Sequence, residues 1–205
     1  MVRLKNSEIT DTICATIVDY YNDHRHLKRH PFVELQMCIL FKYVAEYLTA
    51  IRSRRLTSTN YEKRCRISQH LLKDVQQIDH TFQPFYEDCA GDQNVPKLTV
   101  ILKTIAEMLQ LKDKGMLSLE AASVVHNYPD MPQELLFGIV DARDDITSSE
   151  SWDLVDDCMK MMEKRKSDPV YAHLFQMSRA ERKPSQILKD VVPRLKRRVR
   201  VTMAH

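Results

Sequence analysis

Residues 33–51 read VELQMCILFKYVAEYLTAI, and they set the pattern that the rest of the chain follows. Apolar side chains recur here at steps of three or four residues, as Val33, Met37, Leu40, Val44, Leu48 and Ile51. This spacing places them on one stripe of an α-helix, close to the seam of a coiled coil. We therefore expect a helix that lays this stripe on a neighbouring helix.

Similar stripes occur on both sides of this segment. The first contains Ile9, Ile13, Ile17, Tyr20, His24 and Leu27. A later one contains Ile67, Leu71, Val75, Ile78, Phe82 and Phe85, and another contains Leu98, Ile101, Ile105 and Met108. Only 3 of the 205 residues are Gly, which disfavours the tight turns of sheet proteins. We predict an all-α fold, an elongated antiparallel rod of stacked helices.

Two capping boxes predict where helices begin. Thr59 and Glu62 have the spacing for the start of the third helix, and Thr147 and Glu150 have it for the seventh. We expect the seventh helix to end near Arg165.

The stretch between these two helices has its own start and stop signals. Asp113 is positioned to cap a fifth helix, and Tyr128 must end that helix because it precedes Pro129. Asp130 is then expected to cap a sixth helix.

A domain division is expected near the middle of the chain. Pro84 and Gly91 are predicted to end the third helix, and residues 91–96 have the composition of a linker. The prediction is a helical subdomain over 1–90 and a second over 97–205, packed end to end.

Five acidic residues crowd the segment 126–146, namely Asp130, Glu134, Asp141, Asp144 and Asp145. Such a cluster has three interpretations: helix capping with solvated charge, a metal site, or a partner contact. Hard metals need several oxygens converging from loops, usually with a Gly for the turn, and no such Gly pattern occurs. Arg143 lies among the carboxylates, so we favour capping and solvated charge.

The sequence gives no evidence for an enzyme active site. No nucleophile elbow, phosphate-binding loop, dinucleotide-binding or zinc-protease motif occurs. His24, His26 and His30 have no nearby Cys and are predicted to be a solvated surface. The five cysteines form no CxxC pair, which favours a reducing cytoplasm. We expect no enzyme activity, no cofactor, no signal peptide and no membrane span.

Two basic segments are the candidate contact sites. The first contains Arg52, Arg54, Arg55, Lys63 and Arg64, and the second contains Arg194, Lys196, Arg197, Arg198 and Arg200. Each is either a solvated face or a contact for acidic lipid headgroups or an acidic protein. The net charge of +3 and the acidic stretch 130–157 oppose nucleic-acid binding.

Four stretches resemble the C-terminal region of the exocyst complex component 3 family. They are FKYVAEYLTAIRSRRLTSTNYEKR (41–64), TIAEMLQLKDKGMLSLEAASVVHNYPDMPQELLFGIVDAR (104–143), DPVYAHLF (168–175) and DVVPRL (190–195). The matching positions of the second are Ala106, Glu107, Leu111, Asp113, Leu119, Glu120, Tyr128, Pro129, Asp130 and Arg143. Asp144, where the family commonly has Gly, and the pair Phe137–Gly138 indicate a divergent paralogue.

This family includes the component-3-like proteins and tumour-necrosis-factor-alpha-induced protein 2. The resemblance implies a helical rod that tethers secretory vesicles at the plasma membrane through other exocyst subunits and SNARE proteins. For the induced protein it implies membrane protrusions and nanotubes, with a link to a small GTPase of the Ral type. It transfers no catalytic residue to this chain.

Overall fold

The computed structural model describes residues 7–53, 56–89, 95–161 and 166–179. These residues form eight α-helices and one 3-10 helix, and no strand occurs among them. In chain order the elements are α1 (Ser7–His24), α2 (Arg29–Arg52), α3 (Tyr61–Asp88), α4 (Val100–Gln110), η1 (Lys114–Met116), α5 (Leu117–Asn127), α6 (Gln133–Val140), α7 (Ser148–Lys160) and α8 (Pro169–Arg179). The predicted all-α fold is confirmed.

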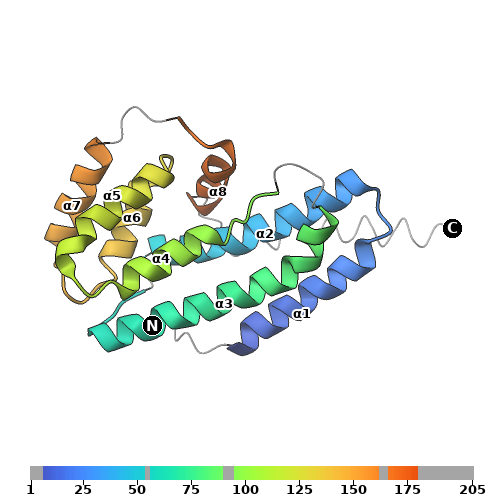
Figure 1. Ribbon diagram of the computed structural model, residues 1–205, viewed down its shortest axis with the longest axis horizontal. Helices are drawn as coiled ribbons and strands as arrows, with labels where there is room; N and C mark the ends of the chain where they lie inside the picture. The colour runs from blue at the N-terminus through green and yellow to red at the C-terminus, as the bar shows by residue number, and fades with distance from the viewer. Residues whose placement is uncertain (1–6, 54–55, 90–94, 162–165, 180–205) are drawn as a thin grey trace.

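Helix α2 packs against helices from both the beginning and the end of the chain. It packs against α1 near the first turn and against α6 and α8 farther along. Its buried face includes Leu40, Val44, Leu48 and Ile51, four of the six residues of the predicted stripe. Figure 1 shows α1, α2 and α3 along the long axis, with α5, α6 and α7 gathered at one end.

Helices α3 and α4 run antiparallel and form the most extensive helix pair among the described residues. Near the C-terminal half of α3, Thr99 Oγ1 donates a hydrogen bond to Asp79 Oδ1 at 2.5 Å. Toward the other end, Ser68 Oγ donates to the carbonyl of Ala106 at 2.6 Å. Apolar side chains of both helices fill the space between these bonds, including the fully buried Ile78 and Ile105.

Helix α6 is buried on nearly every side and touches α2 at close range. An ideal Cβ placed on Gly138 would lie 2.5 Å from the carbonyl oxygen of Ile51. Only a residue without a side chain permits this approach of α6 to the end of α2. Phe137 lies beside it and stacks on Trp152 of α7, with ring centroids 4.1 Å apart.

The first helix uses a different face from the predicted stripe. Ile9, Ile13 and Tyr20 are exposed, whereas Thr10, Cys14 and Ile17 are buried. Thr10 donates a hydrogen bond to Asp74 of α3 at 3.0 Å, which fixes this rotation. The predicted helix is therefore present, but only part of its stripe contributes to the core.

Several predicted helix boundaries are wrong by a few residues. Asn60, not Thr59, caps α3, because its side chain accepts a hydrogen bond from the backbone N–H of Lys63 at 2.8 Å. Helix α3 continues through Pro84 to Asp88. Phe82 and Phe85, which flank this proline in the sequence, are both buried in the core, and their burial offsets the hydrogen bond that the proline removes.

The sixth helix also begins later than predicted, since its N-cap is Pro132 rather than Asp130. The carboxylate of Asp130 instead accepts hydrogen bonds from the Ser167 hydroxyl at 2.8 Å and the Asp168 backbone N–H at 3.1 Å. Asp130 therefore anchors the segment that enters α8.

Other sequence signals are confirmed. Thr147 and Glu150 form a complete capping box at the start of α7. Asp113 caps η1, which leads directly into α5, and α5 ends at Asn127 before Tyr128. The predicted end of the seventh helix near Arg165 is wrong, because α7 ends at Lys160 with Met161 as its C-cap.

The predicted division into 1–90 and 97–205 stays a prediction. Helices from the two sides pack together as α3 with α4, α2 with α6 and α2 with α8. No helix in the described ranges is long and apolar enough to cross a membrane.

Candidate functional site

Two buried arginines form hydrogen bonds with carboxylates of the loop between α6 and α7. Arg64 of α3 is 1% exposed and Arg143 is 4% exposed. The Nη1 group of Arg64 donates hydrogen bonds to Asp144 and Asp145, each at 2.9 Å. Arg143 binds Asp145 with two hydrogen bonds, from Nε at 2.9 Å and from Nη2 at 2.6 Å.

The same guanidinium groups also cap the end of α4. Arg143 Nη1 donates to the carbonyls of Met108 at 3.1 Å and Leu111 at 2.8 Å. Arg64 Nη2 donates to the Leu111 carbonyl at 3.2 Å. The last carbonyls of a helix have no partner within the helix, so these bonds satisfy them. The network joins α3, α4 and the α6–α7 loop.

The electrostatics of Asp145 follow from this network. Its partial burial alone would raise the pKa of the carboxyl. Hydrogen bonds and charge attraction from Arg143, with a further contribution from Arg64, outweigh that effect and lower the pKa of Asp145. The carboxylate is therefore held in its ionised form.

The acidic cluster thus has a structural role rather than an open ligand set. Asp144 and Asp145 bind guanidinium groups, and Asp141 accepts a hydrogen bond from Ser148 at 2.6 Å. Within the described ranges, no group of three or more His, Cys, Asp or Glu side chains is arranged to hold a metal ion.

The described residues of the first basic segment do not form one surface. Arg64 was a predicted lipid or partner contact, and its burial with two carboxylates corrects that assignment. Arg52 is half-buried, and its Nη2 donates to the Arg179 carbonyl at 3.4 Å. Lys63 is half-buried as well, whereas Arg54 and Arg55 lie outside the described residues.

The second basic segment lies wholly outside the part of the chain that the structure describes. Its members are Arg194, Lys196, Arg197, Arg198 and Arg200. Their contact with lipid or protein stays a prediction from the sequence.

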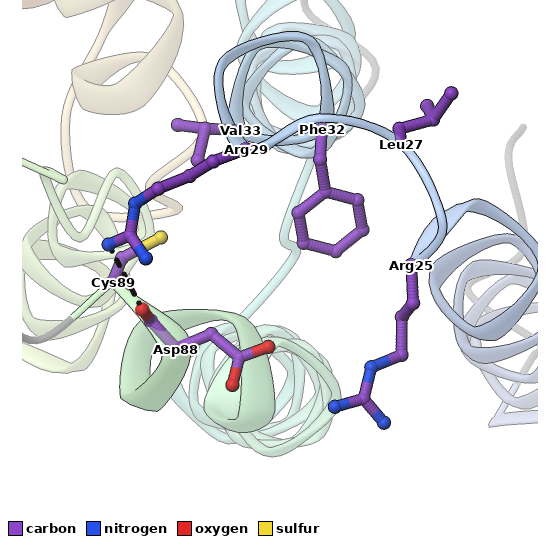
Figure 2. Close-up of a pocket in the computed structure, with 7 residues that line it drawn as sticks. All are labelled: Arg25, Leu27, Arg29, Phe32, Val33, Asp88 and Cys89. Atoms are coloured by element: carbon purple, nitrogen blue, oxygen red, sulfur yellow. Dashed lines mark hydrogen bonds between the residues drawn. The ribbon is translucent and has the colours of Figure 1, made fainter.

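A pocket that the sequence reasoning missed lies at the turn between α1 and α2. It has a volume of about 280 Å³ and is lined by Arg25, Leu27, Arg29, Phe32, Val33, Asp88 and Cys89. Figure 2 shows Arg25 and Arg29 on opposite walls, Phe32 between them and Asp88 below. The pocket is therefore lined by both charged and apolar side chains.

Several contacts fix the groups around this pocket. Arg29 Nη2 donates to the Asp88 carbonyl at 3.2 Å, and the Tyr21 hydroxyl donates to the Asp88 carboxylate. Burial and this hydrogen bond raise the pKa of Tyr21 to about 12. The guanidinium of Arg25 lies over the Tyr21 ring, 5.7 Å from its centroid.

The sequence pattern in this segment predicts only a solvated histidine surface. The sequence signal that could have indicated the pocket is a set of three cations, Arg25, Lys28 and Arg29, interleaved with the apolar Leu27 and Phe32. The Asp88 wall could not be foreseen, because it comes from the far end of α3.

A protein-family model matches more than half of the chain. Residues 4–148 match the model of the exocyst complex component Sec6 family.

Curated relatives agree with this match. Exocyst complex component 3 of Caenorhabditis elegans is 34% identical over 185 residues, which are 89% of this chain and 23% of that protein. The exocyst complex component 3-like protein of Danio rerio is 24% identical, over 70% of this chain and 18% of that protein. The chain therefore spans about a quarter or less of the length of these relatives.

A solved structure shares the fold. The crystal structure of M-Sec is similar with a TM-score of 0.65 at 22% sequence identity, over 84% of this chain and 29% of that one.

Proposed function

Because this chain belongs to the exocyst complex component Sec6 family, we propose that it is a non-enzymatic helical scaffold acting in vesicle tethering at the plasma membrane. The family match is the observation that carries the proposal. Other exocyst subunits are the expected partners, and SNARE proteins are a further class. The place of action is the cytoplasmic face of the membrane.

The arrangement of charge supports a scaffold rather than an enzyme. The most buried ionic groups of the described residues, Arg64 and Arg143, are bonded to carboxylates and helix-end carbonyls. Those bonds fix the relative positions of α3, α4 and α6. A rigid helical body of this kind presents its outer faces to partners without reacting with them.

The test is reconstitution with purified exocyst subunits. The tagged chain is immobilised, incubated with each other subunit and washed, and the retained subunit is quantified. We expect saturable retention of at least one subunit. A variant with Ile105→Asp, which places a charge in the core, is expected to lose it together with its fold. Retention of no subunit would contradict the proposal.

A second candidate function is a peripheral membrane module that remodels membrane, binds acidic phospholipids and acts in a Ral-type GTPase pathway. The basic segment 194–200 favours it, since each Lys or Arg near an anionic surface contributes about 1 kcal/mol. Reversing Lys196, Arg197, Arg198 and Arg200 to Glu should abolish co-sedimentation with phosphoinositide-containing liposomes at low salt. The melting temperature should stay nearly unchanged. Equal sedimentation of the variant would remove this segment from the membrane hypothesis.

A further inference from the structure

We propose that the exposed apolar stripe of α1, formed by Ile9, Ile13 and Tyr20, is the docking surface for residues 194–203 of the same chain. The proposal goes beyond the scaffold function, because it gives the second basic segment a partner inside the chain. It does not depend on which complex the chain joins. It rests on the stripe, on the charge of α1 and on the place where α8 ends.

The stripe is a set of large apolar side chains that face solvent on one side of α1. Ile9, Ile13 and Tyr20 are 54%, 37% and 50% exposed. With 3.6 residues per turn they fall within about 40° of one another, so they form one line along the helix. Thr16 lies on the same line, and its hydroxyl donates to the Thr12 carbonyl at 2.8 Å. A stripe of this kind is typical of a helix that packs against another amphipathic segment.

The charges of α1 favour a basic occupant. Asp19 and Asp23 are exposed and lie on one flank of the stripe. Residues 7–24 contain two further acidic residues, Glu8 and Asp11, and no Lys or Arg. These carboxylates repel an anionic membrane surface, whereas they attract a segment that is rich in Lys and Arg. The surface therefore suits a segment that is both apolar and basic.

Residues 194–203 have this combination in their sequence. Leu195, Val199 and Met203 recur at steps of four, which is the spacing of one helical face. The cations of the segment are Arg194, Lys196, Arg197, Arg198 and Arg200. In a helix with this pattern, the apolar face would pack on the stripe and the cations would meet Asp19 and Asp23. Core and flanking positions of a coiled coil are divided in the same way.

The end of α8 lies close to α1 through the last turns of α2. The Thr49 hydroxyl of α2 is 3.2 Å from the Ser178 carbonyl of α8. Tyr47, within the same turn of α2, donates to the Asp74 carboxylate at 2.7 Å. The same carboxylate accepts the hydrogen bond from Thr10 of α1. The chain that follows α8 therefore starts near the N-terminal half of α1.

The intervening chain is long enough for the contact. Residues 180–193 can span up to about 45 Å, and α1, with 18 residues, is about 27 Å long. Residues 194–203 can therefore reach any part of the stripe. A covalent link of this length gives an effective concentration on the order of mM. Apolar contacts and surface ion pairs that are weak individually suffice for docking at such a concentration.

Hydrogen exchange of the full chain, followed by mass spectrometry, tests the contact. In the parent, the amides of residues 194–203 should exchange at least about tenfold more slowly than those of a free peptide of the same sequence. Ile9→Ser combined with Ile13→Ser removes apolar surface and should restore the rate of the free peptide. The matched control is Val100→Ser with Leu119→Ser, two exposed apolar residues of other helices. Its exchange should stay within about twofold of the parent.

Charge reversal tests whether the two segments meet. Asp19→Lys combined with Asp23→Lys should abolish most of the protection, because it places like charges opposite the basic segment. The same loss is expected when Glu replaces Lys196, Arg197, Arg198 and Arg200. Combining both sets restores opposite charges, and exchange should return to within about threefold of the parent. A combined variant that stays unprotected would show that the segments do not meet and would overturn the proposal.

The remaining outcomes decide between occupants of the stripe. Circular dichroism and thermal melting first establish that each variant is folded. Exchange of residues 194–203 at the free-peptide rate in the parent would overturn the proposal, and so would equal protection in the parent and the Ile9, Ile13 variant. Protection that rises with protein concentration, together with a dimer in analytical ultracentrifugation, would assign the stripe to a second copy of the chain and also overturn it.

Discussion

Arg64 and Arg143 keep their charges inside the protein, where removing one partner of an ion pair is strongly destabilising. Replacing Arg64 by Ala leaves Asp144 with no guanidinium and one carbonyl bond of Leu111 unmade. We expect Arg64→Ala to lower the free energy of unfolding by about 3–5 kcal/mol in a urea titration. Arg66→Ala is the matched control, because Arg66 pairs with Glu62 on the solvent side of the same helix. It should cost at most about 1 kcal/mol, and similar losses for both variants would show that burial does not matter here.

The lowered pKa of Asp145 predicts how stability depends on pH. A carboxyl whose pKa is depressed by folding contributes stability above its unfolded pKa, near the ordinary Asp value of 3.8, and this contribution is lost as the pH falls through the folded pKa. The stability curve of the parent should therefore drop below about pH 4. Asp145→Asn should be less stable at pH 7 and should show a shallower drop in acid. If the stability curves of the parent and of Asp145→Asn run parallel from pH 7 to pH 2, this role of Asp145 is contradicted.

Gly138 has a steric role that one added methyl group can test. A Cβ at this position would lie 2.5 Å from the Ile51 carbonyl oxygen, so Gly138→Ala must push α6 away from α2. We expect a loss of about 1–3 kcal/mol in the free energy of unfolding, the usual cost of overpacking. Gly115→Ala is the control, since its new Cβ would meet only the Asp113 side chain at 3.2 Å. If both variants unfold at the same urea concentration, the close approach of α6 is not required.

At the scale of elements, α4 shows how one helix face contributes to the core. Ile105 is fully buried between α4 and α3, whereas Val100 on the same helix is 41% exposed. Ile105→Ala should lower the free energy of unfolding by about 2–5 kcal/mol, because it deletes apolar volume and leaves a cavity. Val100→Ala deletes a smaller, solvated group and should change it by less than about 1 kcal/mol. Thermal melts of the two variants give the comparison, and matching melting temperatures would place Ile105 on the surface.

Helix existence was predictable because apolar periodicity is a local signal. The stripe of α2 and the capping box of Thr147 and Glu150 need only neighbouring residues, and both are present as expected. The N-cap of α3 shifted by one residue because Asn60 competes with Thr59 for the same role, and both are good capping residues.

Contacts between distant residues were not predictable from the same signals. Arg64 belongs to a run of exposed-looking cations, and its partners Asp144 and Asp145 lie 80 and 81 residues away. The α1–α2 pocket was missed for the same reason, since Asp88 reaches it from the end of α3. The rotation of α1 that exposes Ile9 and Ile13 likewise depends on Asp74, which no local pattern indicates.

At the scale of the whole molecule, α2 connects the early and late parts of the chain. It packs against α1 at one end and against α6 and α8 at the other. The late helix α4 covers α3, an early one, along their shared buried faces. Two subdomains that fold independently would not share their cores in this way, so the contacts favour one cooperative unit.

This arrangement predicts the behaviour of the chain when it is divided. Fragments 1–93 and 94–205 should each lack a cooperative thermal transition, because each exposes apolar faces that the other covers in the intact chain, such as Ile78 and Ile105. Mixed after denaturation and refolded together, they should form a one-to-one complex that melts in a single transition. Circular dichroism follows the melting, and analytical ultracentrifugation measures the mass of the complex. If either fragment alone melted cooperatively at the temperature of the intact chain, residues 1–90 and 97–205 would be independent subdomains, and the shared packing along α2 and α3 would contribute little to stability.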